Sequence, residues 1–217
     1  MIERTVEKFE PIDMGQEVHP SFLALDSHKR DKILNASMRE FRYGYRKAST
    51  DTIVKDAGIS KGLLFRYFGS KANLYRYCAG YAIGIVEGHF GFEVAKLDNH
   101  DIFESLLEAA QISFGIVKRY PDVFGFFGGL YMHGEDAPGL DVSEQYLENQ
   151  KNLRRELFAR CDKSLFRQGV DIDVAAGIIM AVFENICFED CDEDEVRINR
   201  MKAQLGLLRE CFYTEQA

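Results

Sequence analysis

A run of basic, hydroxyl-bearing and aromatic side chains between residues 49 and 71 has the composition of a surface that contacts nucleic acid. Lys61 can donate hydrogen bonds to the O6 and N7 atoms of guanine, and Gly62 lets the backbone approach a base edge closely. Leu63 and Phe65 can pack against thymine methyl groups or sugars. Further contacts, chiefly to phosphates, are expected from other polar side chains of the run and from free amides at helix starts. These residues are Ser49, Thr50, Ser60, Arg66, Tyr67 and Lys71.

Residues suited to catalysis or metal binding are thinly spread over the rest of the chain. Cys187 and Cys191 lie one helical turn apart among acidic residues, which allows a metal site or a thiol sensor. No histidine is close to them in sequence, however, and the acids there also suit the start of the last helix. The 5 histidines are scattered, and a Gly-x-Ser-x-Gly or comparable nucleophile motif is missing. We therefore predict that the chain is not an enzyme and binds neither a metal nor a cofactor.

Presenting the run from 49 to 71 to a partner requires two short helices around a tight turn, and the capping residues predict such a pair. Ser49 or Thr50 caps the first helix, which ends at Gly58, where glycine adopts the left-handed conformation without penalty. Ser60 caps the second helix, whose inner face carries Leu64. This arrangement is the one that places the second of two helices in a DNA groove.

The remainder of the chain is expected to be helical too. Only 4 prolines, long stretches of three-and-four apolar spacing and no alternating β-branched runs favour an all-α fold. Helices are expected from Asp26 or Ser27 to Phe41 with an end at Gly44, from Lys71 through Ile85, and over residues 101–119, 121–132, 141–167, 172–189 and 194–213.

Charge divides the chain into three parts. The net charge is −3 over residues 1–25, +6 over 26–72 and −11 over 73–217. A basic module ahead of an acidic body is typical of a small nucleic-acid-binding unit joined to a second functional part. We expect a flexible N-terminal arm over 1–25, a helix-turn-helix DNA-binding domain over 26–72, and a helical body over 73–217.

The segment from Ser49 to Lys71, STDTIVKDAGISKGLLFRYFGSK, resembles the DNA-binding domain of the tetracycline-repressor (TetR) family. The resemblance covers residues 27–75. It is carried by apolar positions around the Gly58 turn, by the aromatic-rich stretch 64–68, and by a Ser-Lys start to the following helix. Leu63 and Phe65 stand where the family more often has a small hydroxyl residue and a tyrosine, which leaves the operator sequence open.

The resemblance implies an all-α protein with an N-terminal three-helix DNA-binding domain that contains the helix-turn-helix. A larger helical ligand-binding and dimerisation domain would follow. It further implies a sequence-specific transcriptional regulator, most often a repressor that a small-molecule effector releases from its operator. The partners it implies are a double-stranded, palindromic DNA operator, the effector and a second copy of the chain.

Two apolar stripes near the C-terminus are candidates for the dimer interface. One has the spacing of a heptad seam, and the other runs along the preceding helix, so that two copies could form a four-helix bundle. The alternative is that both stripes pack inside the monomer. The stripes consist of Ile198, Met201, Leu205, Leu208 and Phe212, and of Val174, Ile178, Val182 and Ile186.

Aromatic residues in the middle of the chain are candidates for the walls of an effector cavity, although aromatics at helical spacing are by default core. An acidic body also favours a cationic ligand, so we expect an apolar or cationic effector. The candidate residues are Phe114, Phe124, Phe127, Tyr131, His133, Tyr146 and Phe183.

Two further expectations concern location and the main alternative function. Charges interrupt every apolar stretch, so we expect no membrane span, and the acidic first residues do not read as a secretory signal, which predicts a cytoplasmic location. The alternative function is a helical protein–protein interaction module whose basic N-terminal part docks an acidic partner. A preferred DNA duplex with salt-dependent affinity would distinguish the two.

Overall fold

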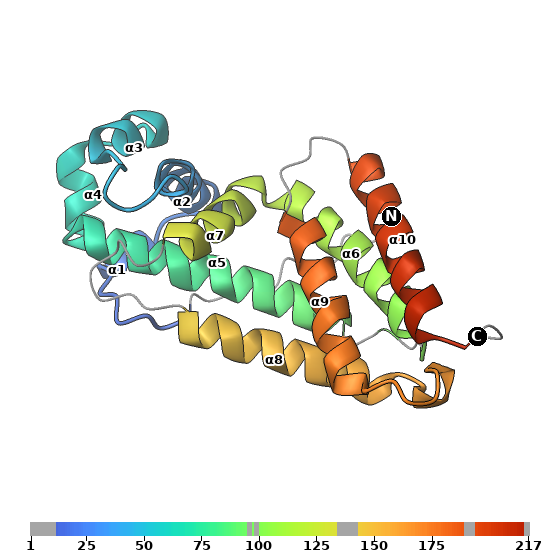
Figure 1. Ribbon diagram of the computed structural model, residues 1–217. Coiled ribbons are helices and arrows are strands. Elements are labelled where there is room, and N and C mark those ends of the chain that lie inside the picture. Colours follow the sequence, from blue (N-terminus) through green and yellow to red (C-terminus); the bar gives the residue numbers. More distant parts are fainter. Residues whose placement is uncertain (1–11, 95–96, 98–99, 134–142, 189–193, 215–217) are drawn as a thin grey trace. The chain divides into compact units, whose positions relative to one another are not determined.

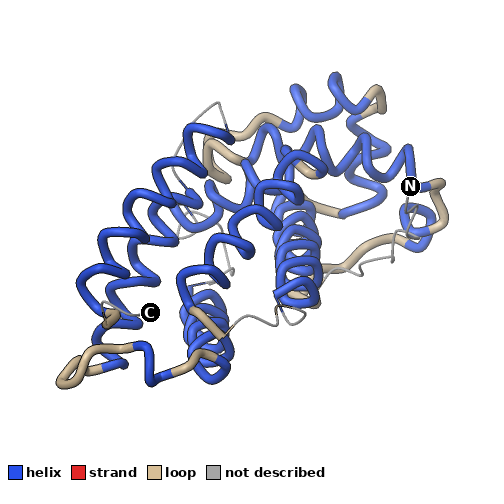
Figure 2. Tube along the Cα trace, turned by 90° about the vertical axis from the view of Figure 1, so that its right-hand side faces the viewer, coloured by secondary structure: helices blue, strands red, loops and turns tan. Residues whose placement is uncertain are grey.

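The computed structural model describes residues 12–94, 97, 100–133, 143–188 and 194–214, and their regular secondary structure is entirely helical (Figures 1 and 2). The prediction of an all-α fold is therefore confirmed. The helices are α1 (Pro20–Leu23), α2 (Ser27–Phe41), α3 (Thr50–Ala57), α4 (Lys61–Phe68), α5 (Lys71–Val94), α6 (Ile102–Arg119), α7 (Pro121–His133), α8 (Ser143–Arg160), the 3-10 helix η2 (Lys163–Leu165), α9 (Ile172–Phe188) and α10 (Asp194–Phe212).

The helices belong to two compact units. Unit 1 comprises Met1–His89 and Tyr120–Glu144, and unit 2 comprises Phe90–Arg119 and Gln145–Ala217. This division differs from the one expected at residue 72, because the larger part of α5 and the whole of α7 pack with the N-terminal helices. The chain passes between the units within α5, at the junction of α6 with α7, and near the start of α8.

Helix α2 of unit 1 begins and ends at the residues that its sequence predicts. The Asp26 carboxylate accepts a hydrogen bond from the Lys29 amide at 3.0 Å and so caps the first turn. The helix ends at Phe41, and the chain turns at Gly44 with a φ of 104°, which favours glycine.

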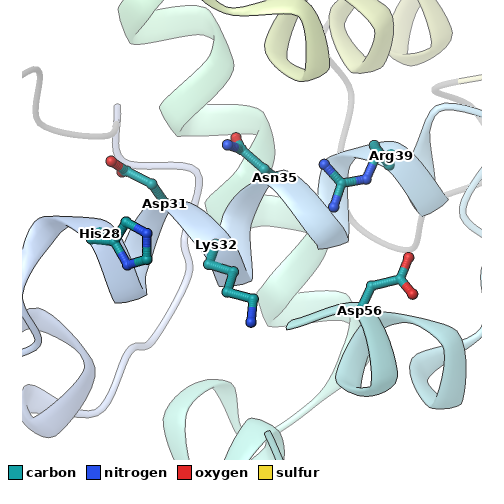
Figure 3. Close-up of a pocket in the computed structure, with 6 residues that line it drawn as sticks. All are labelled: His28, Asp31, Lys32, Asn35, Arg39 and Asp56. Atoms are coloured by element: carbon teal, nitrogen blue, oxygen red, sulfur yellow. The ribbon is translucent and has the colours of Figure 1, made fainter. Parts of the chain in front are cut away.

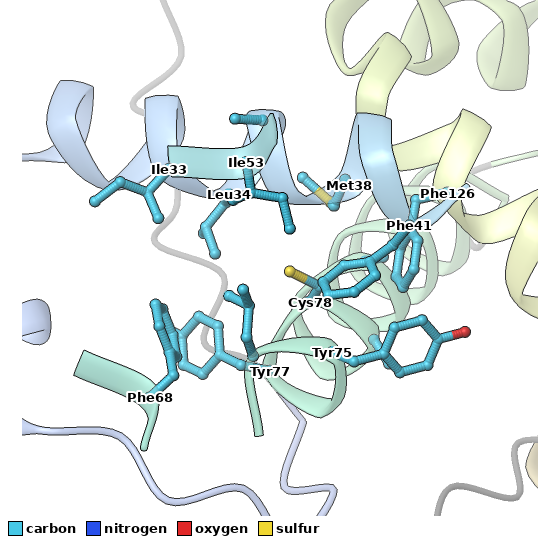
Figure 4. Close-up of a cluster of buried hydrophobic side chains, with 14 of the residues drawn as sticks. Ile33, Leu34, Met38, Phe41, Ile53, Phe68, Tyr75, Tyr77, Cys78 and Phe126 are labelled. Carbon is cyan, nitrogen blue, oxygen red and sulfur yellow. The ribbon is translucent and has the colours of Figure 1, made fainter. Parts of the chain in front are cut away.

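The core of unit 1 lies between α2, α5 and α7, and Figure 4 shows α2 side chains facing those of α5. Three aromatic rings join the helices. The centre of the Tyr75 ring of α5 lies 4.9 Å from that of Phe41 of α2 and 5.4 Å from that of Phe126 of α7. Burial raises the pKa of the Cys78 thiol in this core, so it remains protonated and unreactive.

Helix α7 lies so close to α2 that a side chain is excluded at one position. A Cβ atom added to Gly129 would lie 2.2 Å from the carbonyl oxygen of Arg42, at the end of α2. An ion pair of 2.6 Å between Arg39 and Asp122 also joins the two helices. Any movement of α7 therefore acts directly on α2.

Residues 12–25 pack against unit 1, which differs from the flexible arm expected there. Phe22 is completely buried, with its ring 4.6 Å from that of Phe68. The Ile12 amide donates to the Gly80 carbonyl at 3.0 Å, and a Cβ at Gly80 would lie 2.1 Å from the Ile12 oxygen. The prolines and acids of the segment suggested disorder, whereas its few apolar residues suffice to hold it. We call residues 12–25 the N-terminal strap.

Unit 2 has its own core, in which α6 packs against α9 and α10 and α9 packs against α10. The end of α10 is fixed to the start of α6: the Tyr213 hydroxyl accepts a hydrogen bond from the Ile102 amide at 3.2 Å. An ion pair of 2.8 Å between Arg209 and Asp101 supports the same junction.

Four of the five helices predicted after residue 100 match within two residues, and one is too long. The helix expected over 141–167 ends at Arg160. The chain turns at Asp162, whose carboxylate accepts a hydrogen bond from the Ser164 amide at 2.9 Å and caps η2. A strong capping residue inside an amphipathic pattern was the missed signal. None of the described helices is long and apolar enough to cross a membrane.

Candidate nucleic-acid interface

Helices α3 and α4 form the predicted helix-turn-helix, and local capping fixes both of them. The Ser49 and Ser60 hydroxyls accept hydrogen bonds from the Thr52 and Leu63 amides, at 3.4 and 3.2 Å. Between the helices, Gly58 has a φ of 70°, and its amide donates to the last carbonyls of α3. The turn needs glycine because only glycine adopts this backbone conformation readily.

The outer face of α4 is exposed as predicted. Leu64 and Phe68 point into the core, whereas Lys61, Gly62 and Arg66 are exposed. Phe65 leaves 36% of its surface exposed, and Leu63 is half-buried against the core. A Cβ at Gly62 would meet nothing within 4 Å, so no contact with the described part of the chain requires glycine there. An exposed aromatic ring beside an open glycine and two cations suits a base-reading surface.

Tyr67 lies in the core, although the sequence suggested a phosphate contact for it. Only 7% of its surface is exposed, and its ring lies 5.5 Å from that of Phe22. Its carbonyl accepts a hydrogen bond from the His19 amide of the strap at 2.8 Å. Position 67 is three residues after Leu64 and therefore shares the buried side of α4, which the helical spacing could have shown.

Lys71 is held by groups of its own chain. Its ammonium donates to the Ala48 carbonyl at 2.6 Å and lies 4.7 Å from the centre of the Tyr45 ring. Desolvation lowers the pKa of Lys71, and the charge of Glu40 opposes that shift. Lys71 thus ties the start of α5 to the loop before α3. An ammonium has three protons, so these contacts leave a donor for a phosphate.

Lys61, at the start of α4, forms an ion pair with an acidic residue of α3. Its ammonium lies 2.9 and 3.1 Å from the two carboxylate oxygens of Asp51, in the first turn of α3. Both side chains are exposed. In the unbound chain, therefore, the cation that the sequence predicts to read a base is already engaged by an acid.

The loop between α2 and α3 adds exposed groups that the sequence reasoning missed. Arg42, Arg46 and Lys47 are exposed, as is Tyr43, over whose ring the Arg42 guanidinium lies at 4.5 Å. The loop leads directly into the Ser49 cap. The basic and aromatic run RYGYRK was the signal, because cations interleaved with aromatics suit a nucleic-acid surface.

A surface hollow of about 270 Å³ lies between α2 and α3 (Figure 3). Its charges are mixed, and burial raises the pKa of the Asp31 carboxyl against the opposing charges of Arg30 and His28. The hollow is polar and lies in the helix-turn-helix region, unlike the apolar effector cavity predicted from the sequence. Its lining residues are His28, Asp31, Lys32, Asn35 and Arg39 of α2, and Asp56 of α3.

Of the residues predicted to line an effector cavity, the four whose side chains are described belong to two different cores. Phe124 and Phe127 belong to the core of unit 1, and Phe114 and Phe183 to that of unit 2. The Arg197 guanidinium lies 5.0 Å from the centre of the Phe114 ring. The side chains of Tyr131, His133 and Tyr146 lie outside the described residues.

The residues predicted for the dimer interface separate into exposed and buried groups. Val174 and Ile178 of α9 leave 59% and 44% of their surfaces exposed. Met201, Leu205 and Ile186 are buried in the core of unit 2, because α10 turns its heptad seam toward α6 and α9 of its own chain. The rest are half-buried: Val182, Ile198, Leu208 and Phe212. The sequence reasoning missed the exposed Val196 and Leu207 of α10.

Cys191 and the side chain of Cys187 lie outside the described residues. Among the residues that are described, no group of three or more His, Cys, Asp or Glu side chains is placed to hold a metal ion.

Comparison with known proteins bears on this surface directly. Residues 33–78, which span most of α2, all of α3 and α4 and the start of α5, match the family of bacterial regulatory proteins called the tetR family. No curated protein matches the chain.

Solved structures resemble the whole fold. A TetR family transcriptional regulator from Chloroflexus aurantiacus J-10-FL is 17% identical, with a TM-score of 0.68 over 91% of this chain and 99% of its own. The ketosteroid transcriptional regulator KstR2 of Mycobacterium tuberculosis is 15% identical, with a TM-score of 0.63 over 88% and 97%. The TetR family regulator PfmR from Thermus thermophilus is 18% identical, with a TM-score of 0.61 over 83% and 98%. At these identities the likeness establishes the fold alone.

Proposed function

Because the chain belongs to the tetR family of bacterial regulatory proteins and is a DNA-binding transcription regulator, we propose that it is a dimeric repressor released from its operator by a small molecule. The observation that supports this most directly is the outer face of α4. It exposes cations, a glycine and an aromatic ring at the second helix of a helix-turn-helix. These side chains do not pack in the core of the monomer, and their chemistry suits contacts in the major groove of DNA.

In the proposed complex, Lys61, Gly62, Leu63 and Phe65 read base edges. Arg66 and the capped helix starts contact phosphates, because free amides at a helix N-terminus favour anions. The residues proposed to contact phosphates are thus Arg66, Ser49, Thr50, Ser60 and Lys71. Tyr67 acts from the core by holding α4 in place, rather than as a phosphate contact.

A homodimer is proposed because a palindromic operator needs two recognition helices about one DNA turn, or a multiple of it, apart. The exposed aliphatic residues Val174 and Ile178 of α9 and Leu207 of α10 supply the apolar surface that a second copy would cover. The buried heptad residues then stabilise the monomer on which this surface is built.

Release by an effector is proposed to act through the segments that connect the units. Helix α5 belongs to both units, and α6 leads into α7 through Tyr120 alone. Since α7 contacts α2 at Gly129 and through the Arg39–Asp122 pair, a shift of α5 or α7 would move α3 and α4. A ligand releases DNA in this way only if it prefers one spacing of the two recognition helices.

The proposed effector is apolar or cationic. The core of unit 2 is rich in aromatic and aliphatic side chains, and the Phe114 ring already receives a cation on its face. The net charge of −11 over residues 73–217 favours a cation as well. The named ligand class of the Mycobacterium tuberculosis regulator belongs to that protein, since the likeness reaches the fold only.

The proposal is tested by selecting duplexes from a random DNA pool with the purified full chain. We expect a palindromic site with half-sites about one turn or more apart. Its affinity should fall steeply as salt rises, because phosphate contacts release counterions. No enrichment at low salt would overturn the proposal and favour the alternative, in which the basic face docks an acidic protein.

A further inference from the structure

An acidic side chain lies among the groups proposed to contact DNA. Asp51 is the second residue of α3 and immediately follows Thr50. It is the more exposed member of its ion pair, with 75% of its side chain accessible against 50% for Lys61. In the proposed complex, a carboxylate at this position would lie near the phosphates bound at the start of α3 and would oppose their binding.

The start of a helix favours an acid, but that explanation does not account for the pairing. Asp51 could serve the α3 N-terminus from several rotamers. Here both of its oxygens lie within 3.1 Å of an ammonium ten residues later, at the start of α4. The pair therefore links the phosphate-binding start of α3 to the first base-reading residue of α4.

We propose that Asp51 sets sequence discrimination by holding the Lys61 ammonium until a guanine is presented to it, an inference that rests on the proposed DNA-binding function. On other DNA, Lys61 stays with Asp51, and the pair adds no net attraction to the backbone. At the preferred site, the guanine O6 and N7 atoms take over the ammonium. The exchange is feasible because an exposed ion pair is only weakly favourable in water.

The test compares Asp51→Asn with the wild-type full chain on the selected duplex and on a scrambled duplex of the same length and composition. Asparagine keeps the shape of the side chain but removes the charge that holds Lys61, and the Ser49 cap of α3 is unchanged. We expect tighter binding to the scrambled duplex by at least about threefold, with a salt slope steeper by about one unit. The selected duplex should gain less, so the ratio of the two affinities falls.

Asp56→Asn is the matched control, because it removes the same charge from the exposed far end of the same helix. It should change both duplexes alike. In the double variant Asp51→Asn with Lys61→Met, the effect of Asp51→Asn on the affinity ratio should disappear.

Three results would overturn the inference. The first is an affinity ratio that Asp51→Asn leaves unchanged or changes no more than Asp56→Asn does. The second is a loss of preference at one base pair, which would make Asp51 itself a base-reading residue, for example toward cytosine N4. The third is a wild-type chain that selects no duplex, which would overturn the proposed function and this inference together. The first two leave the proposed function intact.

Discussion

Each unit leaves apolar side chains exposed on a helix, and the surroundings of those side chains differ. In unit 1, Phe65 of α4 lies on a face that it shares with Lys61 and Arg66. In unit 2, Val174 and Ile178 follow each other one turn apart on α9. An aromatic ring among cations fits a polyanion with apolar bases, whereas paired aliphatic residues fit another aliphatic surface.

In both units, exposed apolar residues are available to bind a partner, whereas buried apolar residues stabilise the fold of the unit. In α4 the two kinds are neighbours in sequence, since the buried Leu64 directly precedes the exposed Phe65. In unit 2 each helix carries both kinds: α9 exposes Val174 and Ile178 and buries Ile186, while α10 exposes Leu207 and buries Met201 and Leu205. A substitution at each kind of position should therefore affect assembly or stability, but not both equally.

The largest effect is expected from placing a charge in the buried seam of unit 2. Met201→Lys buries an ammonium without a partner and should cost about 4 kcal/mol in the free energy of unfolding. Ile178→Lys places the same charge on the exposed stripe and should convert dimers to monomers with unchanged helix content. Sedimentation and circular dichroism together check both variants. If Ile178→Lys remained dimeric, the interface would lie on another face.

The N-terminal strap offers a similar contrast in unit 1. Phe22→Ala removes a fully buried ring from contact with Phe68 and Tyr77 and should lower the free energy of unfolding by about 3–5 kcal/mol. Leu23→Ala, at the exposed neighbouring position, should change it by less than about 0.5 kcal/mol. Urea unfolding measures both. Similar losses for the two variants would mean that the strap does not pack on unit 1 in solution.

Two adjacent glycines of α7 should respond to alanine with opposite signs. Gly129→Ala forces a Cβ against the Arg42 carbonyl and should destabilise unit 1 by about 1–3 kcal/mol. Gly128→Ala meets nothing within 4 Å and should stabilise the helix by about 0.5–1 kcal/mol. The midpoints of urea unfolding give both values. A stabilising Gly129→Ala would show that α7 does not approach α2 this closely.

These contrasts show what could be read from the sequence. The starts and ends of α2, α3 and α4 were predictable because caps such as Asp26 and Ser60, and turns such as Gly58, act within a few residues of themselves. The exposure of Lys61, Phe65 and Arg66 on α4 followed from the same local spacing. The partner of an apolar stripe depends on residues distant in sequence, so the spacing of Met201 and Leu205 could not tell a dimer seam from a monomer core.

Other features of the site depend on contacts that no spacing rule reports. The pairing of Asp51 with Lys61 depends on the orientation of α3 relative to α4. The contact of Lys71 with Ala48 joins residues 23 positions apart in sequence. The strap was misjudged because composition suggests disorder only on average, whereas Phe22 alone fills a site between aromatic rings. Capping and spacing therefore predicted the helices of the interface but not the contacts between residues distant in sequence.

Lys61 and Lys71 should differ in what they contribute to DNA binding. Lys61→Ala should cost about 1–3 kcal/mol at the selected site and relax the choice of one base. Lys71→Ala should weaken all duplexes similarly and reduce the salt slope by about one unit. Titrations of both variants at several salt concentrations, with single-base variants of the site, check this. Equal losses on every sequence for Lys61→Ala would make it a phosphate contact, and an unchanged slope would exclude that role for Lys71.

The smallest effect concerns two carboxyl groups whose pKa values are shifted in opposite directions. Desolvation raises the pKa of Asp31 in unit 1, so its ionised form opposes folding. That cost is absent below the unfolded value of 3.8 and is fully present above the raised folded value. Hydrogen bonds from Ser164 lower the pKa of Asp162 in unit 2, so its contribution is present above 3.8 and is lost as the pH falls through the folded value.

Comparing each aspartate with its asparagine variant isolates these contributions from the rest of acid unfolding. The wild-type chain should lose stability relative to Asp31→Asn as the pH rises from about 3 to 6, because the folded state gives up its proton later than the unfolded state. Relative to Asp162→Asn, it should gain stability over the lower part of the same range. Urea unfolding at a series of pH values gives both differences. If the two differences change in the same direction with pH, one of the two carboxyl groups has a different environment from the one described.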